Sequence, residues 1–249
     1  MGENRRLAYL EALGVDVYVR RSRERPCEPE PPAPLAEMGV VAAGATARVA
    51  QVSPESVLDW QPLQQMVSAC TRCALHTTRT QAVFGVGNRQ ASWMFIGEAP
   101  GADEDRQGEP FVGRAGQLLN SMLKALGFNR EDVYIANVLK CRPPGNRDPR
   151  PEEALQCRGY LERQIELVSP KLIVAVGRIA AQNLLATDTA LARLRGKVHA
   201  LGPGGWPLVV TYHPAYLLRS PGEKRKAWQD LLFAKQVYGR IEAGERLLP

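Results

Sequence analysis

The sequence predicts an α/β protein: a three-layer α/β/α sandwich with a central, mainly parallel four-stranded sheet. Short apolar runs typical of buried strands recur after residue 92, and helical patterns of eight or more residues lie between them. Strands that alternate with helices of this length indicate a parallel sheet with helices on both faces. With 249 residues, 45% of them hydrophobic and 23% charged, the chain can bury one large core.

The alternation predicts each element in turn. Four apolar runs predict strands at 93–96, 133–138, 172–176 and 208–211. Helices are expected at 60–69, 115–126, 151–168, 178–185 and 223–238. Ligand sites in sheets of this kind lie beyond the carboxyl ends of the strands, so the residues that follow each strand are the first candidates for a functional site.

The first 58 residues differ in composition from the rest. Residues 1–25 are expected to form a small N-terminal amphipathic element, because three leucines lie at helical spacing before Gly14. Residues 26–58 are rich in Pro and Ala and predict a flexible linker, extended in its proline-rich part. Residues 59–249 are expected to form the one folded domain.

Charge and composition narrow the classes of partner and location. The formal net charge of +6 is consistent with a polyanionic partner such as nucleic acid. No run of 18 or more apolar residues is present, so we expect no membrane partner. The N-terminal residues lack the apolar stretch of a signal peptide, and we therefore expect a cytoplasmic protein of the bacterial cytosol and nucleoid.

Four of the five cysteines are spaced as metal ligands often are. Cys70 and Cys73 form a C-x-x-C pair, and Cys141 and Cys157 follow far downstream, separated by a proline-rich stretch. Four thiolates from two distant segments fit an all-cysteine zinc site or an iron–sulfur cluster. Disulfides or unrelated buried thiols are the alternatives, and a reducing location disfavours the disulfides. A cysteine-based redox enzyme is also disfavoured, because the C-x-x-C pair opens no thioredoxin-like βαβ unit.

A glycine-rich turn and an acidic run follow the first predicted strand. Residues 97–101 read GEAPG, three carboxylates stand at 103–105, and residues 110–116 read PFVGRAG. Glycine-rich turns let a ligand approach the backbone and present amide donors to it. A phosphate-binding loop is the plain alternative. It is disfavoured because the carboxylates would repel phosphate, and because neither the P-loop nor the dinucleotide-binding spacing is present.

Polar side chains also follow the second and fourth predicted strands. Asn137 stands at the end of the second strand, and an Asn side chain presents a donor and an acceptor side by side, which suits the edge of a nucleobase. Taken alone, such an Asn is more often a turn or cap residue. His213 directly follows the fourth strand and precedes Pro214. A histidine at the mouth of a parallel sheet is a better functional candidate than a solvated one.

Together these motifs resemble the family 4 uracil-DNA glycosylases, the iron–sulfur branch of the uracil-DNA glycosylase superfamily. The resemblance covers residues 60–240 and rests on GEAPG with its acidic run, PFVGRAG, the IANV strand, HPAYLLR and the four-cysteine spacing. It implies an enzyme that flips uracil out of single- or double-stranded DNA and hydrolyses its N-glycosidic bond. The abasic site that remains would initiate base excision repair.

The resemblance also implies roles for individual residues. A [4Fe–4S] cluster, away from the catalytic step, would be held by Cys70, Cys73, Cys141 and Cys157. Uracil would be bound by the backbone near Gly97, Glu98 and Ala99 and by the side chains of Phe111, Asn137 and His213. Leu217 would enter the duplex where uracil has left, and Arg219 would hold a phosphate.

Catalysis is expected to depend on two kinds of group. His213 and the loop amides would stabilise the negative charge that builds on uracil, since donors aimed at developing charge are often the largest catalytic term. A carboxylate would help the cationic sugar or position water. Glu98 and Glu104 are the candidates, with Glu98 preferred because it begins the turn. A cap role is the alternative for Glu98, and Glu104 is the candidate for excluding the methyl group of thymine.

The sequence departs from better-known relatives at two points. Family 1 enzymes have an Asp where Ala99 stands and a Tyr where Gly101 stands, so the water-directing carboxylate must come from elsewhere. A related branch traps DNA covalently through a histidine in the basic loop after the Asn strand. The corresponding loop here, residues 144–149, has no histidine, so turnover is expected.

Two alternatives and one further role stay open. One alternative is a non-enzymatic DNA-binding module that a metal stabilises and whose pocket has no catalytic use. The other is a zinc protein of the same fold, which would lack the colour of an iron–sulfur cluster. The N-terminal element, with Arg20 and Arg21 after its leucines, is similar to the clamp-loader-binding end of a bacterial polymerase III psi subunit. It predicts a weak docking partner, the alternatives being an element packed on the core or a disordered tail. We expect a monomer.

Overall fold

The computed structural model describes residues 54–245 and 247. The predicted N-terminal element at 1–25, with its docking role, and most of the predicted linker lie outside the described residues. The end of that predicted linker belongs to the folded domain. Pro54–Val57 forms a 3₁₀ turn, η1, and Glu55 is buried and pairs with Arg72. The domain therefore begins before the predicted boundary.

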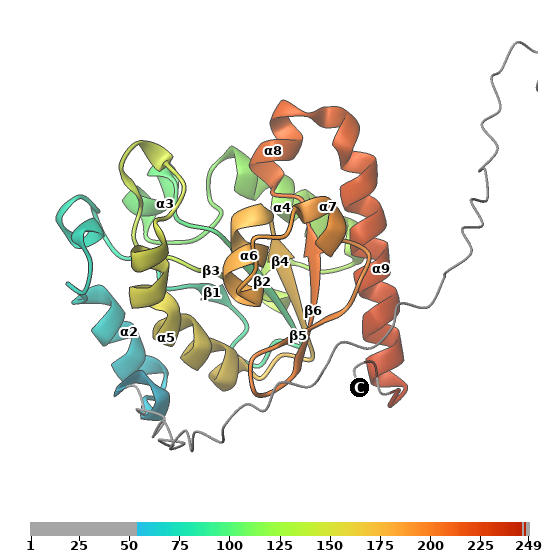
Figure 1. Cartoon of the computed structure of the whole chain (residues 1–249), viewed down its shortest axis with the longest axis horizontal. Coiled ribbons are helices and arrows are strands. Elements are labelled where there is room, and N and C mark those ends of the chain that lie inside the picture. The colour runs from blue at the N-terminus through green and yellow to red at the C-terminus, as the bar shows by residue number, and fades with distance from the viewer. Residues whose placement is uncertain (1–53, 246, 248–249) are drawn as a thin grey trace, which may run out of the picture. The chain divides into compact units, whose positions relative to one another are not determined.

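In the part of the chain that the structure describes, six strands rather than the predicted four form one sheet (Figure 1). Their bounds are β1 Val86–Gly87, β2 Trp93–Gly97, β3 Tyr134–Asn137, β4 Leu172–Val176, β5 His199–Leu201 and β6 Trp206–Thr211. The order is β1-β3-β2-β4-β6-β5, with β3, β2, β4 and β6 parallel and both edge strands antiparallel. The parallel strands are the predicted ones, so the mainly parallel sheet is confirmed and the predicted strand number was wrong.

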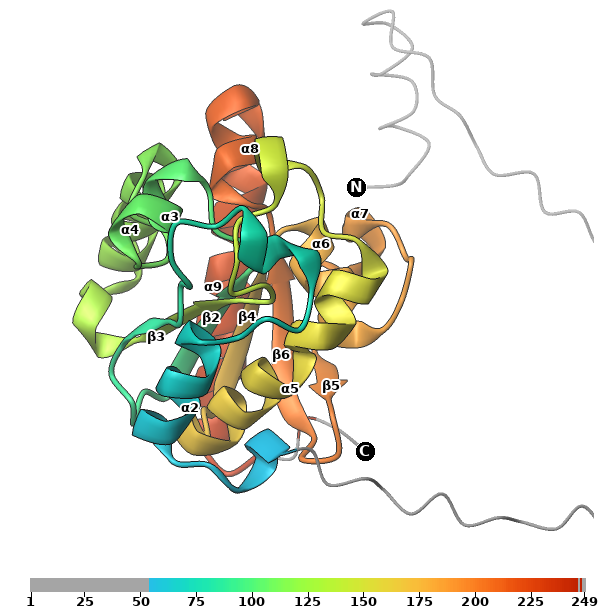
Figure 2. The same ribbon diagram turned by 90° about the vertical axis from the view of Figure 1, so that its left-hand side faces the viewer.

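Helices cover both faces of this sheet (Figures 1 and 2). The α-helices are α2 Trp60–Ser68, α3 Ala102–Gln107, α4 Arg114–Leu126, α5 Pro151–Val168, α6 Arg178–Leu185, α7 Leu191–Leu194, α8 Pro214–Arg219 and α9 Lys224–Glu242. Further 3₁₀ turns are η2 Ala74–Thr77, η3 Arg130–Asp132, η4 Pro144–Asn146 and η5 Pro221–Glu223. None of the helices in the described ranges is long and apolar enough to span a membrane.

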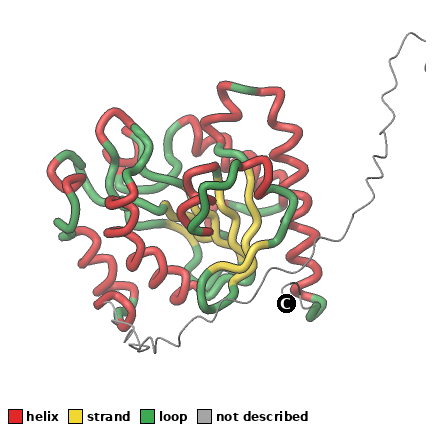
Figure 3. Tube along the Cα trace, viewed as in Figure 1, coloured by secondary structure: helices red, strands yellow, loops and turns green. Residues whose placement is uncertain are grey.

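The two largest parts of the core are apolar layers, one on each side of the sheet. Side chains of α5 and α6 pack around Met94 and Ile173, whereas those of α4 and α9 pack around Phe95 and Val174. Successive strand residues thus point to opposite faces, as a strand buried on both sides requires. Figure 3 shows the strands in yellow between the helices in red. The predicted three-layer sandwich is confirmed.

Candidate active site

A cavity of about 610 Å³ opens at the carboxyl ends of the four parallel strands. Its walls come from the segments that follow β2, β3, β4 and β6, so residues far apart in the sequence meet there. The predicted site residues that line it are Glu98, Ala99, Glu104, Phe111, Asn137, His213 and Arg219. This position agrees with the rule that ligands bind beyond the strand ends of such sheets.

Gly97 allows two of these side chains to meet beside the end of β2. It pairs in register with Asn137, the last residue of β3. A Cβ atom on Gly97 would lie 2.4 Å from Asn137 Oδ1 and 2.5 Å from Phe111 Cζ. Side chains do not tolerate contacts this short, so a glycine is required for the amide and the aromatic ring to share this space.

The Asn137 side chain is buried with an unused acceptor. It is 2% exposed, and its Oδ1 has no hydrogen-bond partner among the described residues. The N–H of Val138 donates to the Gly97 carbonyl at 3.0 Å, which continues the β2–β3 pairing and fixes the backbone beside the amide. A buried polar atom without a partner costs about 1–3 kcal/mol, so such an atom in a cavity points to a ligand or water that completes it.

His213 is held in one tautomer by the turn that starts α8. It caps that helix, and its Nδ1 accepts a hydrogen bond from the Ala215 N–H at 3.1 Å. The proton of the neutral ring therefore lies on Nε2. Burial lowers the pKa of His213 to about 4; Arg219 also lowers it, and Glu104 opposes the shift. The ring lies next to Phe111, with centroids 5.6 Å apart and planes tilted by 30°.

Glu98 carries a carboxyl group that titrates near neutral pH. Burial raises its pKa to about 7, the nearby Asp148 adds to the shift, and Arg178 opposes it. The backbone of Glu98 is fixed, because the Leu139 N–H donates to its carbonyl at 3.0 Å. A carboxyl group tuned in this way is suited to proton transfer or to positioning water.

Glu104 also lines the cavity, yet both of its carboxylate oxygens are engaged with the backbone. Oε1 accepts from the N–H groups of Val112 and Gly113, both at 3.0 Å, and Oε2 accepts from the Gly101 N–H at 3.1 Å. Glu104 therefore ties the turn after β2 to the loop that carries Phe111. These bonds leave the carboxylate in the wall of the cavity with much of its acceptor capacity in use.

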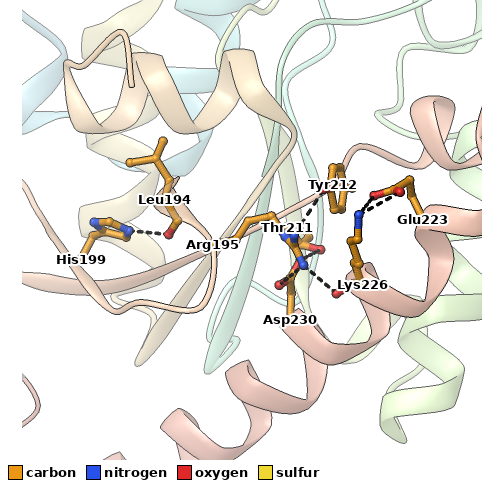
Figure 4. A network of polar contacts seen from close by, with 8 residues as sticks. All are labelled: Leu194, Arg195, His199, Thr211, Tyr212, Glu223, Lys226 and Asp230. Atoms are coloured by element: carbon orange, nitrogen blue, oxygen red, sulfur yellow. Dashed lines mark hydrogen bonds and ion pairs between the residues drawn. The ribbon is translucent and has the colours of Figure 1, made fainter. Parts of the chain in front are cut away.

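A buried ion pair braces the strand end that leads to His213 (Figure 4). Arg195 donates to both carboxylate oxygens of Asp230, at 2.7 and 2.8 Å, and the Thr211 hydroxyl donates to the same carboxylate at 3.0 Å. Arg195 also donates to the Tyr212 hydroxyl at 3.2 Å and lies 4.4 Å from the centre of that ring. These contacts thus hold the end of β6 and Tyr212, the residue before His213, in place.

The residue predicted to enter DNA is not at the surface. Leu217 is 1% exposed, in a helix that packs against α4, and this burial does not favour its insertion into a duplex. Its neighbours Tyr216 and Leu218 are 37% and 36% exposed. Tyr216 stacks on Tyr212, with ring centroids 5.4 Å apart. Arg219, at the end of α8, is exposed and lines the cavity.

The loop between β3 and α5 adds charged residues that the sequence pattern did not single out. Asp148 pairs with Arg178 at 2.8 Å, and both line the cavity beside Glu98. Arg147 forms a two-pronged ion pair with the buried Glu153, at 2.6 and 2.8 Å, which anchors the loop to the start of α5. Their only sequence signal was a charged segment bounded by prolines.

The four predicted metal ligands converge on a second, small cavity. Cys70 and Cys73 come from the turn after α2, Cys141 from the loop after β3, and Cys157 from α5. All four thiols are free, and Arg79 Nη1 donates to Cys141 Sγ at 2.9 Å. Within the ranges 54–245 and 247, no three His, Cys, Asp or Glu side chains are grouped closely enough to hold a single metal ion.

A buried lysine joins the cysteine cavity to the Asn137 segment. Lys140 is buried and lines the cysteine cavity, and its Nζ donates to the carbonyls of Asn137 and Phe84 at 2.9 and 3.3 Å and to the Gln164 side chain. A buried positive charge is costly unless negative charge lies nearby. Burial raises the pKa of Cys141 and of Cys157, so the two thiols would carry that charge when bound to a metal, and the buried lysine beside them fits a metal-bound state.

Comparison with known proteins places this geometry in context. The family model described as "Uracil DNA glycosylase superfamily" matches residues 84–232. A type-4 uracil-DNA glycosylase of Archaeoglobus fulgidus is 52% identical over 180 residues, which cover 70% of this chain and 90% of that protein. A type-4 enzyme of Thermotoga maritima is 46% identical over 177 residues, 70% of this chain and 91% of that protein. A type-5 uracil-DNA glycosylase of Thermus thermophilus is 33% identical over 147 residues, 52% of this chain and 67% of that protein.

Proposed function

Because this chain belongs to the uracil-DNA glycosylase superfamily and is a uracil-DNA glycosylase, we propose that the cavity at its strand ends binds the uracil flipped out of DNA. The observation that carries the proposal is the buried, unpartnered Oδ1 of Asn137 beside the Phe111 ring. Uracil has a donor at N3 and an acceptor at O4, which match the Oδ1 and Nδ2 of an Asn side chain. Stacking on Phe111 would add about 1–3 kcal/mol.

Free uracil should therefore raise the melting temperature of the protein, and cytosine should not. Cytosine carries an acceptor at N3 and a donor at N4, so it presents the reverse pattern to Asn137. A ligand that binds the native state stabilises it by about 2.7 kcal/mol at 100 times its Kd. Thermal melting with increasing uracil or cytosine measures this. Equal shifts with the two bases would refute the assignment of the cavity.

His213 is assigned to the departing base. When the N-glycosidic bond breaks, electrons pass to uracil and negative charge builds on its O2 and O4 oxygens. A neutral imidazole whose proton lies on Nε2 can donate a hydrogen bond to O2 without first giving up that proton. Fixed donors aimed at developing charge are often the largest catalytic contribution. The backbone amides near Gly97, Glu98 and Ala99 are assigned to a second carbonyl oxygen of the base.

The catalytic carboxylate is assigned to Glu98. Its ionised form would stabilise the cationic sugar or orient the attacking water. Glu104, the other candidate from the sequence, already accepts three backbone N–H bonds, which supports a role in shaping the cavity. In that role Glu104 forms part of the cavity wall that would contact the methyl group of thymine. We therefore keep Glu104 as the residue proposed to exclude thymine.

Contact with DNA is assigned to α8. Arg219 is exposed at the rim of the cavity, where a guanidinium can hold a backbone phosphate. Leu218 replaces Leu217 as the residue proposed to fill the space that uracil leaves, because Leu218 is exposed and Leu217 is not. Unstacking costs roughly a few kcal/mol for each base step, and an apolar side chain that inserts into the stack helps to offset this cost.

Leu218→Ala should reduce excision from double-stranded DNA by about 10-fold and leave excision from single-stranded DNA nearly unchanged, since only a duplex has a stack to fill. Rates on matched single- and double-stranded oligonucleotides measure the difference. Leu217→Ala is the matched control. It should lower stability by about 2–5 kcal/mol, as truncation of a buried leucine does, without favouring either substrate. Equal losses of Leu218→Ala on both substrates would exclude this insertion.

We further propose that Cys70, Cys73, Cys141 and Cys157 hold a [4Fe–4S] cluster. Support comes from the convergence of four free thiols on one cavity and from Arg79, which lines that cavity and donates to Cys141. A cluster bound there would tie the turn after α2 to the loop after β3 and to α5, and so supply structure rather than chemistry at the base. Zinc bound by the same thiolates is the alternative.

Absorbance spectroscopy separates the two metals. The purified protein should be brown, with broad absorbance near roughly 400 nm from sulfur-to-iron charge transfer, whereas zinc thiolates are colourless. Iron and acid-labile sulfide should be present at about four of each per chain, as the cluster formula requires. A colourless, folded and active protein that contains zinc would contradict the cluster.

A further inference from the structure

Phe111, the residue proposed to stack on uracil, has a backbone conformation that side-chain-bearing residues rarely adopt. Its φ angle is +54°, in the left-handed region. Such a conformation is unfavourable for a bulky residue and persists only where the surroundings enforce it. The structure shows contacts on both sides of the Phe111 peptide that do so.

One set of contacts holds the carbonyl groups. Arg130, in η3, donates from Nη1 to the Phe111 carbonyl at 3.3 Å and from Nη2 to the Pro110 carbonyl. Nη1 also donates to Asn120 Oδ1 at 3.2 Å. Among the described residues no carboxylate forms an ion pair with Arg130, so its hydrogen bonds serve the loop that carries Phe111 rather than a salt bridge.

The opposite set holds the amide groups that follow. Glu104 accepts from the N–H groups of Val112 and Gly113. Both side chains thus bind the same short segment. Arg130 donates to its C=O groups, and Glu104 accepts from its N–H groups. Burial lowers the pKa of Arg130, and the charges of Glu109, Glu131 and Glu104 oppose this shift.

A third contact closes the remaining space. A Cβ atom on Gly116 would lie 1.8 Å from the Phe111 carbonyl oxygen, because the first turn of α4 presses directly against that peptide. The Phe111 carbonyl can therefore neither rotate toward α4 nor leave Arg130 without breaking a charge-assisted hydrogen bond. The ring is left in contact range of Gly97 and His213.

We propose that Arg130 is a positioning residue for base recognition. Together with Glu104 it holds Phe111 in the left-handed conformation that presents the ring to the flipped base. Arg130 itself touches no substrate and acts through Phe111. This inference rests on the proposed function, because it needs Phe111 to be the stacking surface for uracil.

A double-mutant cycle on single-stranded uracil-containing DNA tests the proposal without the complication of duplex contacts. Phe111→Ala and Arg130→Met should each lower kcat/KM by about 10- to 100-fold, as loss of a stacking contact does. The loss should fall mainly on KM and on the affinity for free uracil. The double variant should be no worse than Phe111→Ala alone, because without the ring Arg130 has nothing left to position.

Two further variants separate positioning from stability. Arg163 is similarly half-buried and donates to the Leu58 carbonyl at 2.6 Å and to Glu166 at 3.0 Å, away from the cavity. Arg163→Met should lower the melting temperature but leave kcat/KM unchanged. Arg130→Lys, which keeps the charge and can still reach one carbonyl, should recover part of the uracil affinity lost in Arg130→Met. If Arg130→Met does not fold, the uracil affinity of Arg130→Lys still tests the proposal.

The outcomes distinguish the inference from its premise. If Phe111→Ala weakens uracil binding but neither Arg130 variant does, the positioning role is overturned and the stacking role stands. If the losses of Arg130→Met and Phe111→Ala multiply in the double variant, Arg130 acts independently of Phe111 and the inference is again overturned. If Phe111→Ala itself has no effect, the proposed stacking fails, and the positioning role fails with it.

Discussion

Asn137→Asp should reduce kcat/KM for uracil excision by about 10⁴-fold, within the range in which a site built to hydrogen-bond its ligand rejects a mismatched one. The Asn137 amide is buried, and its Oδ1 has no hydrogen-bond partner among the described residues. An aspartate keeps the shape but loses the donor to O4. It also places a negative charge at a buried position beside a carbonyl oxygen of the base.

The measurement is steady-state excision together with the affinity for free uracil. Asn183→Asp, an exposed position on α6, makes the same chemical change away from the strand ends and should leave both quantities unchanged. Both variants should fold, since Asp and Asn have nearly the same volume. A folded Asn137→Asp protein with wild-type kcat/KM would exclude the pairing between Asn137 and the uracil edge.

Glu98→Gln should lower kcat/KM by about 10²–10⁴-fold and remove the main pH dependence of the reaction. Glu98 has a pKa raised to about 7, chiefly by burial. If its ionised form acts, wild-type kcat/KM is full above about pH 8 and falls about tenfold for each pH unit below 7, as expected for a single ionisation. His213, with a pKa lowered to about 4, stays neutral over this range, so its titration adds no further pH dependence to the rate.

Asp148→Asn provides a directional check on this prediction. The Asp148 charge raises the pKa of Glu98, so neutralising it should move the acidic limb of the profile to lower pH while the plateau stays high. The rate profile of each variant between about pH 5 and 9 gives the answer. A Glu98→Gln enzyme that keeps the wild-type acidic limb would show that another group carries the titration.

The parallel core could be predicted from the sequence because each of its strands is an unbroken apolar run. Phe95, Ile135, Val174 and Val209 are buried strand residues at the centres of those runs. The edge strands gave no such signal. β1 is two residues long and contains Gly87, and β5 is three residues long with only Leu201 fully buried. Pairing with a neighbour, which a single sequence does not reveal, makes them strands.

The candidate site was predictable where it follows strand ends, and less so where it depends on contacts through space. Asn137 and His213 each come directly after a predicted strand, and the structure brings them to the same cavity. The burial of Leu217 could not be predicted, because α8 has only six residues, too few for a periodic pattern to separate the buried face from the exposed one. Arg130 gave no signal, because its bonds to the Phe111 and Pro110 carbonyls join residues about 20 positions apart in the sequence.

A crystal structure with free uracil tests the central claim most directly, because the claim concerns where the base lies. We expect the base to be stacked on Phe111, with its N3–O4 edge against the Asn137 amide and O2 within hydrogen-bond reach of His213 Nε2. Glu98 should lie on the side where the sugar would be attached. Uracil bound elsewhere, or an empty cavity at a uracil concentration that saturates the protein in solution, would contradict the account.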